Sequence, residues 1–437
     1  MGAFEIRGGN TLSGTITPQG AKNEALQVLC AALLTDEAVT FTNVPDILDV
    51  NMLIEVLGDM GVQVTRPAAN TVILQATDIN TEYFTDKNFK KKSGKLRGAV
   101  MLAGPMIARF RKAHIPQPGG DKIGRRRLDT HIRGFEKLGV VFDYDNEQSL
   151  FSLDGSNLQG AYILMEEPSV TGTANIVMAA VMAEGTTVIY NAACEPYVQQ
   201  LCHMLNSMGA NISGIGSNML TIQGVTKLRG CTHRMLADMI EVGSFIGMAA
   251  MTQSELTIRN CDVAHLGVIP EIFQRLGIAL QINGNDIHVP KQEQYRIQKF
   301  IDGSILTVYD HPWPGFTPDL LSIVLVTATQ AKGTVLLHQK MFESRLFFVD
   351  KLIEMGAQIV LCDPHRAVVI GLDRQVPLRG ITMSSPDIRA GVALLIAALS
   401  AKGKSTIQNI DQIDRGYERI DERLIALGAD IKRVKVD

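Results

Sequence analysis

Cysteine is scarce in this chain of 437 residues, and the cysteines that occur are widely dispersed. No two of them form a Cys-x-x-Cys pair, and the nine histidines show no spacing typical of metal ligands. The sequence therefore predicts neither a disulfide framework nor a zinc site, and no bound metal. We expect reduced thiols, most of them packed in the core, at Cys30, Cys194, Cys202, Cys231, Cys261 and Cys362.

The sequence also lacks long apolar runs and an excess of positive charge. The stretch from Ala390 to Ala401 is among the most apolar and is too short to span a bilayer. The first seven residues carry an acid and a base where a signal peptide would need an apolar segment. The formal net charge of −3 and a pI near 6.3 argue against nucleic acid as a main partner. We therefore expect a cytoplasmic protein with no membrane insertion and no nucleic-acid partner.

One helix-and-strand unit is repeated six times along the chain. Each copy has a helical run rich in Ala, Leu and Met, a short β-branched strand, a second helical stretch and a closing glycine. A glycine at that place suits the left-handed residue that ends a helix. The pattern predicts an α/β or α+β fold with mixed sheets. The closing pairs, spaced 68 to 79 residues apart, are Met60-Gly61, Leu138-Gly139, Met208-Gly209, Leu276-Gly277, Met355-Gly356 and Leu427-Gly428.

The length of the chain exceeds the size at which a single core keeps growing, so we expect two domains. Six copies then predict three in each domain. A solenoid of six copies is the alternative, although no terminal copy resembles a polar cap. No long linker rich in Pro, Gly or Ser marks a boundary, and we expect a tight passage between the domains, such as a double crossing.

The second copy differs from the others by an insertion, Pro118 to Asp129, with the sequence PGGDKIGRRRLD. Between Arg109 and Arg127, seven basic side chains stand against one acidic side chain, Asp121. Glycines let a ligand approach the backbone closely, and guanidinium groups bind phosphate or carboxylate. The insertion therefore predicts an anion site, with a solvated surface loop as the alternative. The strands of the six copies are expected at 38–43, 112–116, 186–191, 255–260, 334–338 and 405–409.

Charged residues recur at two equivalent points of the copies, both of them at expected helix N-termini. Free N–H groups and the helix dipole favour anions there, so cations at these points indicate a bound anion. For any single residue, a solvated charge or an exposed ion pair is the alternative. The first point holds Lys22-Asn23, Lys95 to Arg97, Asp319 and Asp387 to Arg389, and the second holds Arg126, Glu343 to Arg345 and Asp414-Arg415. The set suits a substrate with several phosphate or carboxylate groups.

Asp319 follows Pro318 in the sequence WPGFTPD, immediately before an apolar helical run. Proline restricts the backbone in front of the carboxylate. Taken alone, an aspartate at this place is best interpreted as a helix N-cap. A general base held at the edge of a cleft is the other interpretation.

Five motifs together resemble the UDP-N-acetylglucosamine enolpyruvyl transferase family, also called UDP-N-acetylglucosamine 1-carboxyvinyltransferase. They run in order along the chain: GAKNEAL at 20–26, PGGDKIG at 118–124, FESR at 342–345, DIRA at 387–390 and IDRGYERI at 413–420. The resemblance implies an inside-out α/β barrel of two domains, the enolpyruvyl transferase fold. One domain would span 21–236 and the other 1–20 plus 237–437, with the active site in the cleft between them.

The same resemblance implies the reaction. The enolpyruvyl group of phosphoenolpyruvate moves to the 3′-hydroxyl of UDP-N-acetylglucosamine through a tetrahedral ketal, and phosphate is released without a cofactor. This is the first committed step of peptidoglycan synthesis. The resemblance leaves the oligomeric state open. The residues that match the family's catalytic positions are Lys22, Asp121, Asp319 and Arg415. Those that match its substrate-binding positions are Asn23, Arg97, Arg126, Ser169, Val170, Met341, Arg345, Asp387 and Arg389.

One position departs from the commoner family pattern: most members carry a cysteine where this chain has Asp121. A thiol has a reference pKa of about 8.5 and is a soft nucleophile, whereas aspartate, at about 3.9, attacks an epoxide poorly. We therefore expect resistance to fosfomycin, the epoxide that alkylates the family's loop cysteine. A carboxyl there could still protonate the methylene carbon if its pKa is raised in a closed site.

Two other functions remain open. The sister enzyme, 3-phosphoshikimate 1-carboxyvinyltransferase, has a similar fold and chemistry but a different acceptor. A non-catalytic sugar-nucleotide binder or a scaffold built from repeats belongs to another class. A binder or scaffold without catalytic activity should lack the charged residues of the active site, yet Lys22, Asp319, Arg389 and Arg415 are all present.

Overall fold

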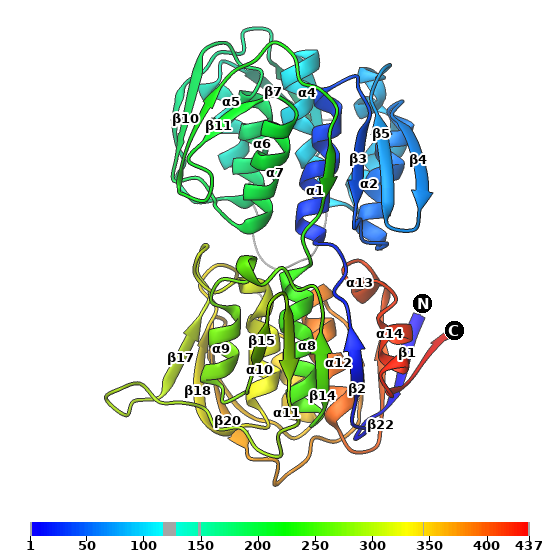
Figure 1. Ribbon diagram of the computed structural model, residues 1–437, viewed down its shortest axis with the longest axis vertical. Helices are drawn as coiled ribbons and strands as arrows, with labels where there is room; N and C mark the ends of the chain where they lie inside the picture. Colours follow the sequence, from blue (N-terminus) through cyan, green and yellow to red (C-terminus); the bar gives the residue numbers. More distant parts are fainter. Residues whose placement is uncertain (1, 117–127, 147–149, 344, 436–437) are drawn as a thin grey trace. The chain divides into compact units, whose positions relative to one another are not determined.

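The computed structural model describes residues 2–116, 128–146, 150–343 and 345–435, which form two compact units (Figure 1). The first unit takes in residues 2–19 and 237–435, and the second takes in residues 20–116 and 128–236. Each unit contains three of the six copies. Within the described ranges, no helix is both long enough and apolar enough to cross a membrane.

The second unit has buried helices at its centre and three sheets outside them (Figure 1). The central helices are α1 (Lys22–Ala31), α4 (Ala103–Phe110) with the preceding 3-10 helix η3 (Arg97–Leu102), and α6 (Val170–Ala180). The other helices are η1 (Ala32–Leu34), α2 (Leu48–Asp59), η2 (Thr81–Thr85), α3 (Lys87–Ser93), α5 (Asp129–Lys137) and α7 (Pro196–Ser207).

The three sheets of this unit are short; two are mixed, and the described strands of the third are antiparallel. One has the order β13 (Thr232–Arg234), β3 (Val39–Thr42), β5 (Thr71–Gln75), β4 (Gln63–Ala68). Another has the order β11 (Asn211–Ser213), β12 (Met219–Gln223), β10 (Thr186–Tyr190), β9 (Tyr162–Leu164). The third has the order β6 (Lys112–Pro116), β8 (Leu150–Asp154), β7 (Val141–Asp145).

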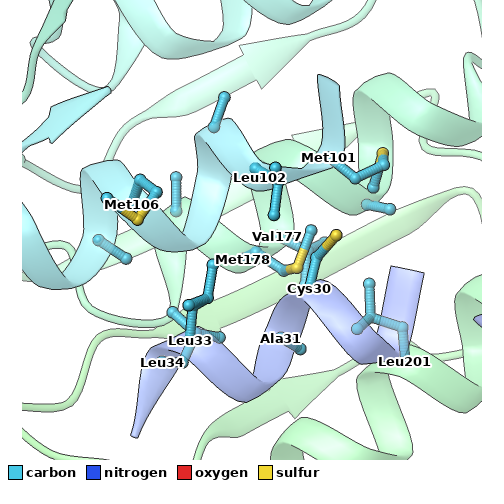
Figure 2. Packing of buried hydrophobic residues seen from close by; sticks show 14 of the residues in the cluster. Cys30, Ala31, Leu33, Leu34, Met101, Leu102, Met106, Val177, Met178 and Leu201 are labelled. Carbon is cyan, nitrogen blue, oxygen red and sulfur yellow. The ribbon is translucent and has the colours of Figure 1, made fainter. Parts of the chain in front are cut away.

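In the second unit, η3, α4 and α6 consist mainly of apolar residues, which is why they are buried instead of lying on the surface. Figure 2 shows Cys30 of α1 next to Met101 and Leu102 of η3 and to Val177 and Met178 of α6. All five side chains are at most 2% exposed. The six cysteines all lie within the described ranges and none is in a disulfide. Four of them are buried, which agrees with the core packing expected for most of them.

The first unit repeats this plan. Its central helices, α8 (Met239–Met251), α10 (Leu321–Ala328) and α12 (Ile388–Ser400), contact one another and are buried over almost their whole length. The other helices are η4 (Val263–His265), α9 (Ile269–Arg275), η5 (Pro318–Leu320), α11 (Val349–Glu354), α13 (Asp411–Asp414) and α14 (Ile420–Ala426).

The first unit also has three sheets. One has the order β15 (Gln281–Asn283), β16 (Asp286–Val289), β14 (Glu255–Ile258), β2 (Ser13–Ile16). Another has the order β17 (Leu306–Tyr309), β18 (Lys332–His338), β20 (Arg366–Leu372), β19 (Gln358–Asp363). The third, β21 (Thr382–Ser384), β22 (Lys404–Gln408), β1 (Gly2–Arg7), β23 (Asp430–Lys435), joins strands from the two ends of the chain.

The repeat predicted from the sequence is confirmed in the backbone. The six closing glycines all have a positive φ, between 86° and 106°, so each can end its helix in the left-handed conformation. Each predicted strand is present, as β3, β6, β10, β14, β18 and β22. Five sheets share one pattern, with one parallel pair followed by two antiparallel pairs. The sixth, in the copy with the insertion, has only its antiparallel strands among the described residues.

Candidate functional site

Asp319 lies in η5, immediately before α10, and its carboxylate receives two arginines. Arg345 donates from Nη2 to Oδ1 at 2.7 Å, and Arg389 donates to Oδ2 from Nε at 3.1 Å and from Nη2 at 3.0 Å. The three side chains are only 7–17% exposed. These contacts form a buried cluster with one negative and two positive charges.

The electrostatics of this cluster favour a further anion. Burial opposes ionisation of Asp319, but the charges of Arg389 and Arg345 outweigh it and lower the pKa of this carboxyl. Burial also penalises the charge of Arg389, yet Asp319 raises the pKa of its guanidinium. Among the described residues, Nε of Arg345 and Nη1 of Arg389 have no hydrogen-bond partner. Buried N–H groups are rarely left without an acceptor, so both donors suit an anionic ligand.

The interpretation of Asp319 as a helix N-cap is wrong. Thr317 is the cap, because its hydroxyl accepts from the N–H of Asp319 at 3.4 Å. The Asp319 carboxylate is therefore available to the arginines. The local sequence could not decide this, since Arg345 and Arg389 lie 26 and 70 residues further along the chain.

Asp387 fixes the backbone beneath Arg389. Its Oδ1 accepts from the N–H of Arg389 at 2.8 Å and from that of Ala390 at 3.0 Å, which makes Asp387 the N-cap of α12. The Arg389 guanidinium carbon lies 5.8 Å from the centre of the Tyr417 ring, which is buried. Arg389 is therefore held by a helix cap, an ion pair and an aromatic face.

Met341 lies in the loop after β18 and is 36% exposed. Its N–H donates to Oδ2 of Asp310 at 3.2 Å, and Asp310 also accepts from the N–H of Lys340 and from the side chain of Gln339. Asp310 is fully buried, so it fixes the start of the loop that carries Met341 and then Arg345. No sequence signal indicated Asp310, because its partners are defined only by the folded loop.

Arg415 lies directly after α13, and its Nη1 donates to Oε1 of Gln412 at 2.9 Å. The sequence placed it between a strand and the second helix of its copy, and it lies between β22 and α14. Tyr417, two residues further on, shares a hydrogen bond of 2.8 Å with Ser244 of α8. The segment after Arg415 is therefore attached to a central helix.

In the second unit, Lys22 is the first residue of α1, and its Nζ lies 2.7 Å from Oδ2 of Asp49, in the first turn of α2. The two side chains are 8% and 7% exposed. A cation at a helix N-terminus opposes the helix dipole, and Asp49 offsets that repulsion. The sequence did not predict Asp49, because no motif near this residue indicates that it pairs with a lysine in another helix. Asn23 follows Lys22 and is partly exposed.

The other predicted residues of the second unit also lie at helix starts. Arg97 begins η3, and Val170 is the first residue of α6. Ser169 is the N-cap of α6, because its hydroxyl accepts from the N–H of Gly172 at 3.2 Å. A serine cap leaves the other N–H groups of the first turn able to bind a phosphate or another anion.

A buried histidine contacts the first turn of α6. In His131 of α5, Nδ1 lies 3.0 Å from Nδ2 of Asn175 and Nε2 lies 3.1 Å from Oγ1 of Thr171. Burial, with a smaller contribution from the charge of Arg97, lowers the pKa of His131 to about 3. The imidazole is therefore neutral at pH 7, with Nδ1 accepting from the Asn175 amide. No pattern in the sequence indicated these hydrogen bonds.

The structure thus brings Asp319, Arg345, Arg389 and Asp387 together in the first unit and pairs Lys22 with Asp49 in the second. Two residues expected in the site, Asp121 and Arg126, lie outside the described residues. No group of three His, Cys, Asp or Glu side chains that could hold a metal ion occurs in the part of the chain that the structure describes.

Comparison with known sequences gives matches over nearly the whole chain. The family model of EPSP synthase (3-phosphoshikimate 1-carboxyvinyltransferase) matches residues 6–424. The UDP-N-acetylglucosamine 1-carboxyvinyltransferases of Porphyromonas gingivalis and Bacteroides thetaiotaomicron are each 63% identical over 434 residues, which covers 99% of this chain and 100% of the relative. The protein of the same name from Borrelia garinii is 49% identical, with both chains fully covered.

Comparison with solved structures shows the same fold at low sequence identity. The enolpyruvyl transferase NikO from Streptomyces tendae superimposes with a TM-score of 0.87 at 21% identity, covering 100% of this chain and 99% of that chain. EPSP synthase from Acinetobacter baumannii gives a TM-score of 0.71 at 18% identity, with both chains fully covered. These likenesses confirm the predicted enolpyruvyl transferase fold; at such identities they say nothing about the acceptor.

Proposed function

Because the chain belongs to the EPSP synthase family and, within it, to the UDP-N-acetylglucosamine 1-carboxyvinyltransferases, we propose that it transfers the enolpyruvyl group of phosphoenolpyruvate to the 3′-hydroxyl of UDP-N-acetylglucosamine. Phosphate leaves, and the reaction proceeds by addition and elimination through a tetrahedral ketal without a cofactor. The protein would act in the cytoplasm, in the first committed step of peptidoglycan synthesis. The observation that carries this proposal is the identity of 63% over the full length of relatives with that name.

The cluster around Asp319 supports a role for its carboxylate as the base at the attacking hydroxyl. The carboxylate is ionised at neutral pH and can accept a proton, but its lowered pKa makes it a weak base before a substrate binds. An anionic substrate that binds the free donors of Arg345 and Arg389 would compete for their charge. That competition raises the pKa of Asp319 toward the value that a general base needs.

The cations of the proposal come from both units. Lys22, Arg126 and Arg415 would bind phosphoenolpyruvate, and preorganised cations would stabilise the charge on the phosphorylated tetrahedral carbon. Asn23, Ser169 and Val170 would contact the sugar nucleotide, and Arg97 would be a further arginine of the site. In this assignment the start of α6 receives the diphosphate, consistent with the preference of helix N-termini for anions. Met341, Arg345, Asp387 and Arg389 complete the proposed set.

Asp121 would donate the proton to the methylene carbon of phosphoenolpyruvate. The proposal predicts that the protein is not inactivated by fosfomycin, because a carboxylate attacks an epoxide poorly. The variant Asp121→Cys should keep its activity and become sensitive, as measured by phosphate release before and after incubation with the drug. Rapid irreversible inactivation of the unaltered protein, with an adduct on Asp121, would contradict this.

The function itself is tested by phosphate release from phosphoenolpyruvate with each acceptor in turn. UDP-N-acetylglucosamine should support turnover and shikimate 3-phosphate should not. Turnover with shikimate 3-phosphate alone would assign the chain to the sister reaction. Binding of UDP-N-acetylglucosamine without any phosphate release would indicate a non-catalytic binder.

A further inference from the structure

Gln19 is the last residue of the N-terminal segment of the first unit, and the chain enters the second unit at Gly20. Its main chain is fixed on both sides. The N–H of Gln19 donates to Oε2 of Glu241 at 2.6 Å, and its carbonyl accepts from the N–H of Asp238 at 2.8 Å. Glu241 is itself held by Arg423, whose Nη1 and Nη2 donate to its two oxygens at 2.5 and 3.1 Å. The backbone of Gln19 therefore has little freedom.

The side chain of Gln19 binds a segment almost 400 residues away. Its Nε2 donates to the carbonyl of Gly416 at 2.8 Å, and its Oε1 accepts from the N–H of Glu418 at 2.6 Å. One carboxamide thus bridges the two peptide groups that flank Tyr417. Gln19 is 7% exposed, so both bonds are shielded from water and costly to lose.

The segment that Gln19 holds connects two arginines of the site. Arg415 precedes Gly416 directly, and the Tyr417 ring lies under the guanidinium of Arg389. Gly416 packs so tightly that an added Cβ would lie 2.5 Å from a side-chain carbon of Ile388. A glycine gives the segment conformational freedom that some other contact must remove.

We propose that Gln19 is a positioning residue: its carboxamide fixes the backbone of 416–418 and thereby holds Arg415 in place for phosphoenolpyruvate. The inference rests on the proposed function for the role of Arg415. Gln19 acts through this backbone and does not itself need to touch a substrate.

The test compares Gln19→Met with a matched control. Gln292 bridges a main-chain segment in the same way, because its Oε1 accepts from the N–H of Ala279 at 2.7 Å and its Nε2 donates to the carbonyl of Gly277 at 3.1 Å. Gln292→Met therefore removes the same pair of bonds away from the proposed site residues. Both variants are assayed for phosphate release and for binding of UDP-N-acetylglucosamine by calorimetry.

We expect Gln19→Met to raise the KM for phosphoenolpyruvate about tenfold, the size of effect that corresponds to about 1.4 kcal/mol. The dissociation constant for UDP-N-acetylglucosamine should change by less than about twofold, because only the cation of the other substrate is displaced. Gln292→Met should change neither value. An unchanged KM in folded Gln19→Met, or an equal rise in the control, would overturn the inference.

Two further measurements keep the test decisive if Gln19→Met does not fold. Gln19→Glu keeps the acceptor for Glu418 but loses the donor to Gly416, and it should raise the same KM. In the unaltered protein, the Glu418 amide should be protected from hydrogen exchange, and free exchange of that amide would overturn the inference. If the unaltered protein releases no phosphate with either acceptor, the proposed function fails, and this outcome differs from a kinetically silent Gln19 variant.

Discussion

The two units balance their buried cations differently. In the second unit, Lys22 faces the carboxylate of Asp49 in an ion pair with one charge of each sign. In the first unit, the single carboxylate of Asp319 is shared by Arg345 and Arg389. Burying an ion costs several kcal/mol unless an opposite charge offsets it. The Lys22–Asp49 pair has one charge of each sign, whereas the Asp319 cluster has one positive charge in excess.

This difference indicates how each unit would meet an anionic substrate. The cluster in the first unit already has two donors without a partner, so an anion can bind there and leave the contacts of Asp319 in place. Lys22 would have to share its charge between Asp49 and the substrate. The Asp319 cluster of the first unit can therefore bind an anion without losing an ion pair. In the second unit, an anion would compete with Asp49 for Lys22.

The largest expected effect is that of Asp319→Asn. The amide keeps the shape but cannot accept the proton, so turnover should fall by about a thousandfold, within the range for loss of a general base. Phosphate release at saturating substrates measures this. The control is Asp363→Asn, which removes the partly exposed carboxylate that accepts from Arg366 Nε at 2.7 Å. If Asp319→Asn kept most of the activity, its role as the base would be excluded.

A smaller effect is expected from Lys22→Met. It removes the cation of the Lys22–Asp49 pair, so kcat/KM for phosphoenolpyruvate should fall by about a hundredfold. The protein should also lose about 3 kcal/mol of stability, because one partner of a buried ion pair is removed. Urea unfolding and phosphate release measure the two effects.

The double variant Lys22→Met with Asp49→Asn separates these effects. Removing the carboxylate as well should restore much of the stability, since no buried charge is then left without its ion pair. It should not restore activity, because the cation is still missing. Recovery of activity in the double variant would mean that Lys22 serves only to neutralise Asp49.

The smallest effect is the pH dependence of stability. The pKa of Asp319 is lowered in the folded protein, so its ionised form stabilises the fold above the unfolded value of about 3.9. This contribution is lost as the pH falls below that value. The difference in unfolding free energy between the unaltered protein and Asp319→Asn should therefore be smaller at pH 3 than at pH 7. A difference that does not change with pH would contradict the lowered pKa.

The sequence predicted the repeat well because the repeat depends on local rules. A closing glycine and a β-branched strand are recognisable within a few residues, and all six glycines have the expected left-handed backbone. The charged helix starts were recognised for the same reason. The two interacting partners Asp49 and Gln19 were not predicted, since their contacts join distant segments; Gln19 and Gly416 are 397 residues apart.

The error over Asp319 has the same origin. Its local sequence fits a cap, and the neighbouring Thr317 competes for that role and takes it. Only the fold shows that Arg345, from the same copy, and Arg389, from the next copy, converge on the carboxylate. Residue types at helix starts thus predict which positions carry charged side chains, whereas tertiary packing determines which of these side chains form ion pairs.

The most direct test of the account is the identity of the product formed from phosphoenolpyruvate labelled at its central carbon. In the presence of UDP-N-acetylglucosamine, NMR should find the label in an enol ether on the 3′-oxygen of the sugar, with one phosphate released for each label transferred. Phosphate release with the label in free pyruvate, or a label that never reaches the sugar nucleotide, would contradict it.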